Sequence, residues 1–192
     1  WVYQAGYPEF TLAASWDSTT SVVTLQVAQV QADTLKADST GLRYSVQQAF
    51  RMPVAVRVGT ESGDIVGHAM LAEREQVIQV PGVTTAPTMV IFDDGNTILK
   101  RLTFDQPITW LAAQLSHDQN LWNRAWVIDR LAERKNDTDA LAALLHAATK
   151  ADYFLTRAQA VTALAGFTGP GVNAALLEAL KDSSAQVRAA AA

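Results

Sequence analysis

Residues 124–132 read RAWVIDRLA, and residues 157–165 read RAQAVTALA. The two segments share an Arg-Ala start, an aliphatic residue at the fifth place and a Leu-Ala end, at an offset of 33 residues. A second motif, AALL at residues 142–145, returns 32 residues later at residues 174–177. Repetition at a nearly fixed spacing indicates an array in which each unit packs on its neighbours.

The repeat continues at residues 187–189, where VRA opens a third copy. Two helices in each unit, spaced by 31 to 33 residues, are typical of an α-solenoid of the HEAT-like kind. Such arrays hold, cover or bind other molecules and rarely catalyse reactions. Because the chain starts at Trp1 without a methionine and stops at Ala192 inside an alanine-rich helix, we expect a piece of a longer protein whose array is truncated.

Alanine content divides the chain into two parts. Residues 1–104 contain 11 alanines, and residues 105–192 contain 22. Alanine is the best helix former and is depleted in strands. The sequence therefore predicts an α+β chain of two domains, a β domain over residues 1–104 and an all-α HEAT-like domain over residues 105–192.

Alternating apolar and polar residues predict short strands in the first domain. Residues 23–28 and 54–58 have the period of two expected of a strand with one buried face. We expect these strands to form a small antiparallel β-sandwich of the immunoglobulin-like kind. Shorter apolar runs complete the set at residues 65–71, 77–80 and 89–92.

Turn and loop residues separate the predicted strands. The sequence DDGN at residues 93–96 is a hairpin signal and predicts a further strand over residues 97–100. Residues 31–48 are polar and weakly patterned, and we interpret them as a long connection.

Helix start and stop signals organise the second domain. Asp105 is the expected N-cap of its first helix, with Pro107 in the first turn. A second helix is predicted over residues 118–134, and TGPG at residues 168–171 breaks the chain between later helices as a C-cap glycine and a proline should. The expected buried face of the second helix consists of Ala125, Ile128 and Ala132.

Charge and cysteine content exclude several classes of protein. The net charge of −4 divides into −3 for residues 1–104 and −1 for residues 105–192, so neither part has the basic field that nucleic acid or an anionic membrane requires. No stretch approaches the roughly 18 consecutive apolar residues of a membrane span. The absence of cysteine excludes disulfides and thiolate metal sites but leaves the cellular compartment open.

Histidines and paired carboxylates are the candidates for chemistry. His68, His117 and His146 stand far apart and lack the spacing of a zinc site, so we expect surface or packing roles, with His146 the least improbable exception. Glu73 and Glu75 would be neighbours on a strand, as glycoside hydrolysis requires, but both lie in a hydrophilic link. The pair Asp93 and Asp94 is explained by its turn. We therefore predict no catalytic, cofactor-binding or metal site in this chain.

An aspartate precedes an arginine by five or six residues in each repeat. One interpretation makes the arginines a ladder for an acidic partner. The other, which we favour, makes each aspartate a group that satisfies free amides at a helix start and pairs with arginine along the stack. The residues are Asp118, Asp152 and Asp182, and Arg124, Arg157 and Arg188.

Three tryptophans, Trp110, Trp122 and Trp126, lie close together in the sequence after the domain boundary. We expect them to pack as large rigid rings where the two domains join. A platform for stacking nucleic-acid bases is the alternative, and the lack of a basic surface argues against it.

Several segments of the first domain carry a resemblance to a known family. The opening WVYQAGYP at residues 1–8 resembles the segment that follows the catalytic domain in zinc aminopeptidases of the aminopeptidase N type. Residues 23–29 resemble a strand of that family that ends in glutamine, and residues 50–54, FRMPV, resemble its aromatic-x-x-Pro-aliphatic strand. Residues 90–93 and 98–100 resemble its closing hairpin. Over residues 105–192 the resemblance is architectural.

The resemblance implies a β-sandwich and a HEAT-like helical domain that follow a catalytic domain. The family's H-E-x-x-H motif, its glutamate ligand, its recognition glycines and its catalytic tyrosine belong to that preceding domain, so none is carried over to this chain. The resemblance implies that the array covers the catalytic cleft and limits entry to it. Expected partners are the chain's own catalytic domain and the parent's peptide substrate, and zinc is expected only in the parent.

Two alternatives remain at the level of the sequence. The parent could lack the protease motif, in which case the repeats would be a scaffold whose concave face holds a partner protein. A carbohydrate-binding sandwich is the weaker alternative, because the strands show no exposed row of aromatic residues; Trp16 is the residue that would test it.

Overall fold

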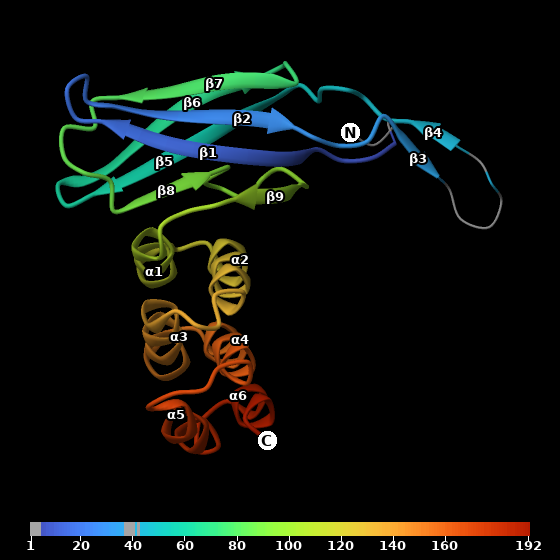
Figure 1. Ribbon diagram of the computed structural model, residues 1–192. Coiled ribbons are helices and arrows are strands. Elements are labelled where there is room, and N and C mark those ends of the chain that lie inside the picture. Colours follow the sequence, from blue (N-terminus) through green and yellow to red (C-terminus); the bar gives the residue numbers. More distant parts are fainter. Residues whose placement is uncertain (1–4, 37–40, 42) are drawn as a thin grey trace. The chain divides into compact units, whose positions relative to one another are not determined.

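The computed structural model describes residues 5–36, 41 and 43–192, so the predictions on residues 1–4 lie outside the described residues. The chain forms two compact units, Trp1–Gln106 and Pro107–Ala192 (Figure 1). The described part of the first unit contains strands, and the second contains helices. The predicted α+β class is therefore confirmed.

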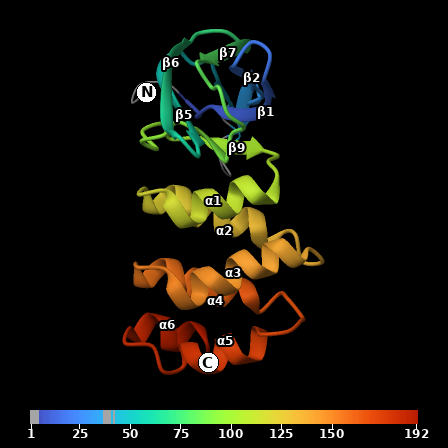
Figure 2. The same ribbon diagram turned by 90° about the vertical axis from the view of Figure 1, so that its left-hand side faces the viewer.

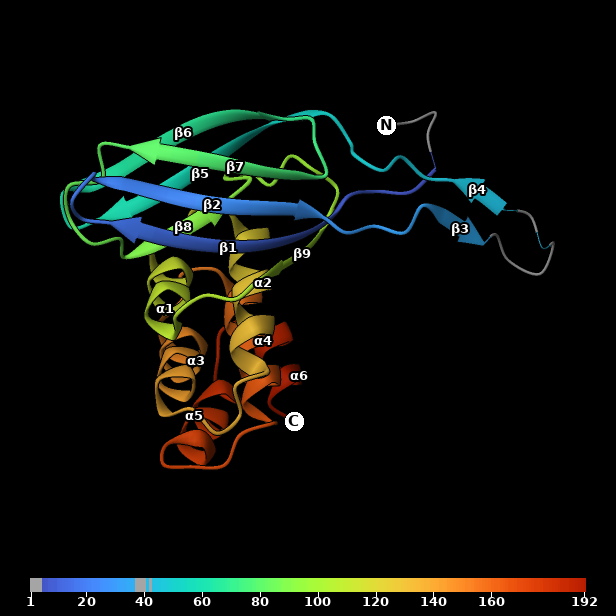
Figure 3. The ribbon, with the colours of Figure 1, turned by 45° about the horizontal axis from the view of Figure 1, so that its top comes forward.

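Two larger sheets build the sandwich of the first unit, as Figure 3 shows. One has four strands in the order β7-β2-β1-β9, and the other has three in the order β6-β5-β8. Phe10 of β1 and Phe92 of β8 meet edge to face between the sheets, with ring centroids 5.1 Å apart. The strands are β1 (Glu9–Asp17), β2 (Val22–Gln29), β5 (Met52–Thr60), β6 (Gly63–Leu71), β7 (Glu75–Pro81), β8 (Met89–Phe92) and β9 (Arg101–Phe104).

The period of two in the sequence sets the core between these sheets. Every second residue of β2 and β5 is buried, which confirms the strands predicted at residues 23–28 and 54–58. Burying one face of each strand supplies the main driving force for packing the sheets. These core residues are Val23, Leu25, Val27, Val54, Val56 and Val58, each at most 4% exposed.

The hairpin and strand predicted at residues 93–100 are wrong. The carboxylate of Asp93 accepts hydrogen bonds from the Thr97 and Ile98 amides at 3.0 and 2.9 Å and from Lys100 Nζ at 2.6 Å. These bonds hold residues 93–100 as a loop around one buried carboxylate. The next strand, β9, pairs with β1 in parallel, so the sandwich is not wholly antiparallel.

The connection predicted at residues 31–48 contains a short antiparallel ladder. Its strands are β3 (Thr34–Lys36) and β4 (Arg43–Ser45), while residues 37–40 and 42 lie outside the described residues. Polar side chains organise this segment. The side-chain amide of Gln31, a residue 3% exposed, donates to the Gln47 and Gln48 carbonyls at 3.0 and 2.9 Å.

The second unit stacks its helices in two columns, α1-α3-α5 and α2-α4-α6 (Figures 1 and 2). Helix α3 packs more extensively on α4 than on α2, so the repeating pairs are α1/α2, α3/α4 and α5/α6. The sequence motifs at residues 124–132 and 142–145 placed α2 and α3 in one unit, and the contacts correct this grouping. The helices are α1 (Ile108–His117), α2 (Leu121–Ala132), α3 (Thr138–Lys150), α4 (Phe154–Leu164), α5 (Val172–Ala179) and α6 (Ala185–Ala190).

Helix starts differ from the predicted caps. The N-cap of α1 is Pro107 and not Asp105, because proline fixes φ and has no amide to satisfy. Helix α2 begins at Leu121 because the Asn120 side chain accepts hydrogen bonds from the Trp122 and Asn123 amides. The break at residues 168–171 is confirmed, but its Gly171, at φ 88°, precedes α5 and does not end α4.

The buried face of α2 is rotated relative to the predicted face. Val127, Ile128 and Leu131 are at most 2% exposed, whereas Ala125 and Ala132 are only partly buried. Large aliphatic side chains gain more from leaving water than alanines do, so they take the core positions. Ile128 is the one residue of the predicted face that lies in the core.

Candidate functional site

The three histidines lie apart, on β6, α1 and α3. His68, His117 and His146 are all exposed, and His117 Nδ1 lies 2.9 Å from the Ala113 carbonyl. Within the described ranges, no group of three or more His, Cys, Asp or Glu side chains could hold a metal ion. The residues present do not fit a zinc site, which needs three or four convergent ligands.

Glu73 and Glu75 line one groove on the outward face of the four-stranded sheet. The groove has a volume of about 690 Å³, and Thr11, Gln26 and Val77 also line it. Its lining contains neither a histidine nor an aromatic ring. The structure thus brings the two carboxylates together without the row of rings that stacking on a sugar would use.

The other candidates from the sandwich have structural partners. Asp94 pairs with Arg57 Nε at 2.6 Å, and Asp93 holds its own loop. The Trp16 indole donates to the Val83 carbonyl at 2.8 Å. These contacts explain the residues through the fold of the sandwich.

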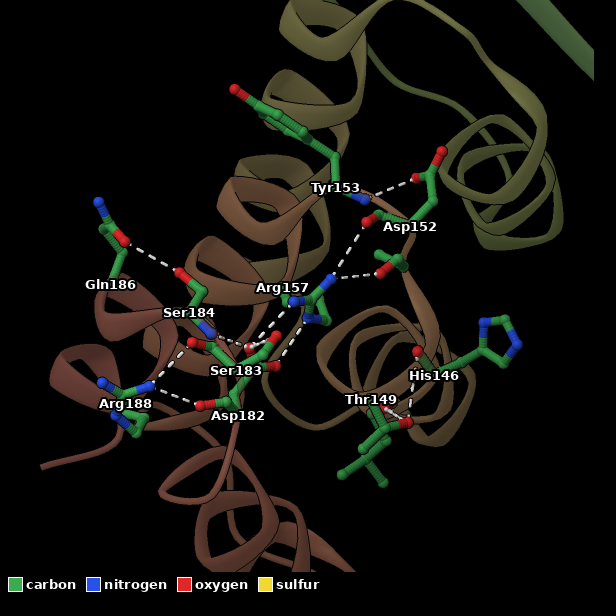
Figure 4. A network of polar contacts seen from close by, with 12 residues as sticks. His146, Thr149, Asp152, Tyr153, Arg157, Asp182, Ser183, Ser184, Gln186 and Arg188 are labelled. Carbon is green, nitrogen blue, oxygen red and sulfur yellow. Dashed lines mark hydrogen bonds and ion pairs between the residues drawn. The ribbon is translucent and has the colours of Figure 1, made fainter.

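The aspartates and arginines of the repeats form a ladder through the helical unit. Arg124 donates to the main-chain carbonyl of Asp118 in its own repeat and to the carboxylate of Asp152 in the next, the latter at 2.5 Å. The predicted pairing along the stack is thereby confirmed. Figure 4 shows the following rungs of this Asp–Arg ladder.

The second rung joins the same kinds of partner as the first, but its arginine holds the carboxylate at two points. Arg157 donates to the Ala151 and Asp152 carbonyls at 2.9 and 3.2 Å and grips both carboxylate oxygens of Asp182 at 2.8 and 3.0 Å. Arg188 makes main-chain contacts of the same kind, donating to the Asp182 and Ser183 carbonyls at 2.7 and 3.0 Å. A two-point grip by a planar guanidinium fixes orientation as well as distance.

The ladder shifts the ionisation of its acids. Hydrogen bonds from Arg157 and from the Ser184 amide lower the pKa of Asp182 to about 2. The hydrogen bond from Arg124 likewise lowers the pKa of Asp152, and the bond to Asp182 raises the pKa of Arg157. Asp152, Arg157 and Asp182 therefore stay charged across the physiological range.

A groove that the sequence did not reveal runs between α2 and α4. It consists of two hollows of about 310 and 390 Å³ that share Leu155 and Gln159. Trp122, predicted to pack at a domain junction, instead exposes 75% of its surface beside this groove. We call this surface the α2/α4 groove; it is lined by Trp122, Ala125, Asp129 and Ala132 from α2 and by Leu155 and Gln159 from α4.

None of the helices in the described part of the chain combines the length and apolar character needed to cross a bilayer. This finding comes from residues 5–36, 41 and 43–192.

Comparisons with known proteins show what the fold of this chain is similar to. Residues 108–192 match the family model described as HEAT repeats. The chain is also similar to the crystal structure of Legionella pneumophila aminopeptidase A in complex with aspartic acid, with a TM-score of 0.56 and 14% sequence identity. That similarity covers 96% of this chain and 21% of the aminopeptidase chain, and no curated protein matches. The likeness is therefore one of fold, and this chain spans about a fifth of the length of the aminopeptidase chain.

Proposed function

We propose that this chain is a non-catalytic accessory region of a zinc-aminopeptidase-like protein of the aminopeptidase N type. In this proposal the β-sandwich positions the helical array, and the array covers a catalytic cleft in a preceding domain. The single observation that carries the proposal is that the fold likeness to the aminopeptidase covers 96% of this chain yet 21% of the other. A separate catalytic domain would occupy the remainder of such a protein.

The Asp–Arg ladder supports a covering role through rigidity. A cover acts by exclusion and orientation, and it must hold its shape to admit peptides and reject folded chains. Arg124 and Arg157, 6% and 15% exposed, tie successive helix pairs together. The partners in this proposal are the chain's own catalytic domain and the peptide substrate, and zinc belongs to that domain.

Assay of the isolated chain tests this proposal. Purified residues 1–192 are expected to leave an aminoacyl reporter uncleaved and to bind no stoichiometric zinc. Chelator-sensitive cleavage by the isolated chain would contradict the proposal. The sequence that precedes Trp1 in the parent is expected to contain H-E-x-x-H followed by a glutamate about one helix later.

A protein-interaction scaffold is the second candidate function, and the α2/α4 groove is the observation that favours it. Helical repeat arrays commonly bind partners on extended surfaces. If the parent lacks H-E-x-x-H, the scaffold role replaces the covering role.

A further inference from the structure

Small residues line the α2/α4 groove on both helices, among them Ala132 of α2 and Ala163 of α4. Trp122, Ala125, Asp129 and Ala132 follow one another at spacings of three and four residues, which places them on one face of α2. Alanines at 125 and 132 leave a hollow between the ridges of the two helices, because they carry only a methyl group. A third helix can approach such a surface closely.

One end of the groove is apolar and exposed. Trp122 exposes 75% of its surface, Leu155 43% and Leu121 39%. A tryptophan left this exposed beside two leucines is unusual for a surface that faces only water, and tryptophan is enriched among the residues that dominate binding energies. The apolar end therefore fits a large aliphatic side chain of a partner.

The other part of the groove carries a negative charge. Asp129 is the charged residue of the lining, and it is exposed without an ion pair among the described residues. The neighbouring Arg130 is engaged by Glu133 at 2.8 Å and by the Trp126 ring at 5.9 Å. A lysine or arginine of the partner would complement Asp129 and would favour a basic segment over an acidic one.

The distances define the partner further. Trp122 and Asp129 are seven residues apart on α2, which corresponds to about 10 Å along the helix axis. We propose that the α2/α4 groove binds an amphipathic helix of another protein, one with a large aliphatic residue and a lysine or arginine about two turns apart on one face. This binding site does not depend on the covering role.

Defined helical peptides test the proposal on the full chain of residues 1–192. The probe is a stapled alanine-based peptide of about 15 residues, a length at which unstapled helices are marginal, with leucine and lysine about two turns apart on one face. One control peptide has glutamate in place of lysine, and another places leucine and lysine on opposite faces. Fluorescence anisotropy is expected to show that the first peptide binds more tightly than both controls. Equal binding of the three peptides, or no binding of any, would overturn the proposal.

Two pairs of variants locate the site. Trp122→Ala is expected to weaken binding of the leucine-lysine peptide by about tenfold or more, as loss of an interface hot spot does. Leu177→Ala, at a leucine 62% exposed on α5, is the matched control and should leave binding unchanged. Equal effects of the two substitutions would place the peptide elsewhere and overturn the proposal.

Charge reversal provides the second pair. Asp129→Lys is expected to shift the preference toward the leucine-glutamate peptide, whereas Glu178→Lys, at an exposed residue of α5, should not. An unchanged preference in Asp129→Lys would overturn the proposal. Circular dichroism confirms that each variant keeps its helices. Failure here would leave the reporter and zinc tests of the covering role unaffected, so the two proposals fail separately.

Discussion

Asp182 is the residue on which the second rung of the ladder depends. Its carboxylate receives two bonds from Arg157 and one from the Ser184 amide at 2.8 Å. Its side chain is 14% exposed, and that of Arg157 is 15% exposed, so water competes weakly for these bonds. A partly buried charge that loses its partner is costly to leave behind.

Removing the charge of Asp182 tests how much its pairing with Arg157 contributes to stability. Asp182→Asn is expected to lower the free energy of unfolding by about 1–3 kcal/mol, because Arg157 loses its negatively charged partner and one of its two acceptor oxygens. Urea unfolding followed by circular dichroism measures the change. The control is Asp33→Asn, which removes an ion pair with Arg74 whose side chains are 61% and 48% exposed. That pair should contribute at most about 1 kcal/mol; an equal loss in both variants would contradict a special role for the ladder.

The depressed pKa of Asp182 predicts a loss of stability in acid. The folded pKa of about 2 lies below the ordinary value of about 3.9 in an unfolded chain. The contribution of this group is therefore full above about pH 4 and is lost as the pH falls toward 2. In Arg157→Met, carboxyl NMR titration should show the pKa of Asp182 moving up toward about 3.9. A pKa that stays near 2 would show that Arg157 is not its main cause.

The sequence predicted that aspartates and arginines pair along the stack, because both recur once per repeat. It could not predict that Arg124 and Arg157 would bond the carboxylates 28 and 25 residues further on and also main-chain carbonyls of their own repeats. That choice depends on how far one helix pair is displaced from the next. The exposure of Trp122 was also missed, because the large size of its ring was taken to indicate burial.

At the scale of elements, Gly67 shows how tightly β6 lies against β7. A Cβ added at Gly67 would approach Val80 Cγ2 to 2.9 Å, which is closer than such atoms normally come. Gly67→Ala is expected to destabilise the chain by about 1–3 kcal/mol through overpacking. Thermal unfolding should show that adding Val80→Ala costs less than the sum of the two single changes. Full additivity would mean that the two sites are not in contact.

Elements with a strong apolar period were predicted well, and those built on polar side chains were not. The alternation in β2 and β5 predicts strands because burial of one face determines the conformation. The loop at residues 93–100 and the β3/β4 ladder depend on the single side chains of Asp93 and Gln31, whose partners are not visible in a periodic pattern. The start of α1 was missed because Asp105, two residues before Pro107, was taken for the N-cap.

At the scale of the whole molecule, each unit has its own core, so each should respond to its own substitutions. Leu164 of α4 is fully buried, and Leu164→Ala is expected to destabilise the helical unit by about 2–5 kcal/mol. Hydrogen exchange should then accelerate in α4 and in α2, α3 and α6, which pack on α4. Leu177→Ala, at an exposed leucine, should change stability by no more than about 0.5 kcal/mol. Similar losses in both variants would contradict the assigned core.

The order of the two units could be predicted from composition and periodicity, because alanine enrichment and repeated motifs are properties of long segments. The purpose of the array could not, since a cover and a scaffold require the same packing. The cover therefore stays a proposal to be tested in the parent protein, and the scaffold stays its alternative.

The covering role is tested most directly in the parent protein, by comparing the intact protein with one that lacks residues 107–192. The rates to measure are those for a small aminoacyl reporter and for aminoacyl substrates attached to long or folded chains. If the array covers the cleft, both proteins will cleave the small reporter in a chelator-sensitive way, and only the shortened protein will lose discrimination against large substrates. Unchanged discrimination, or a parent without any such activity, would contradict it.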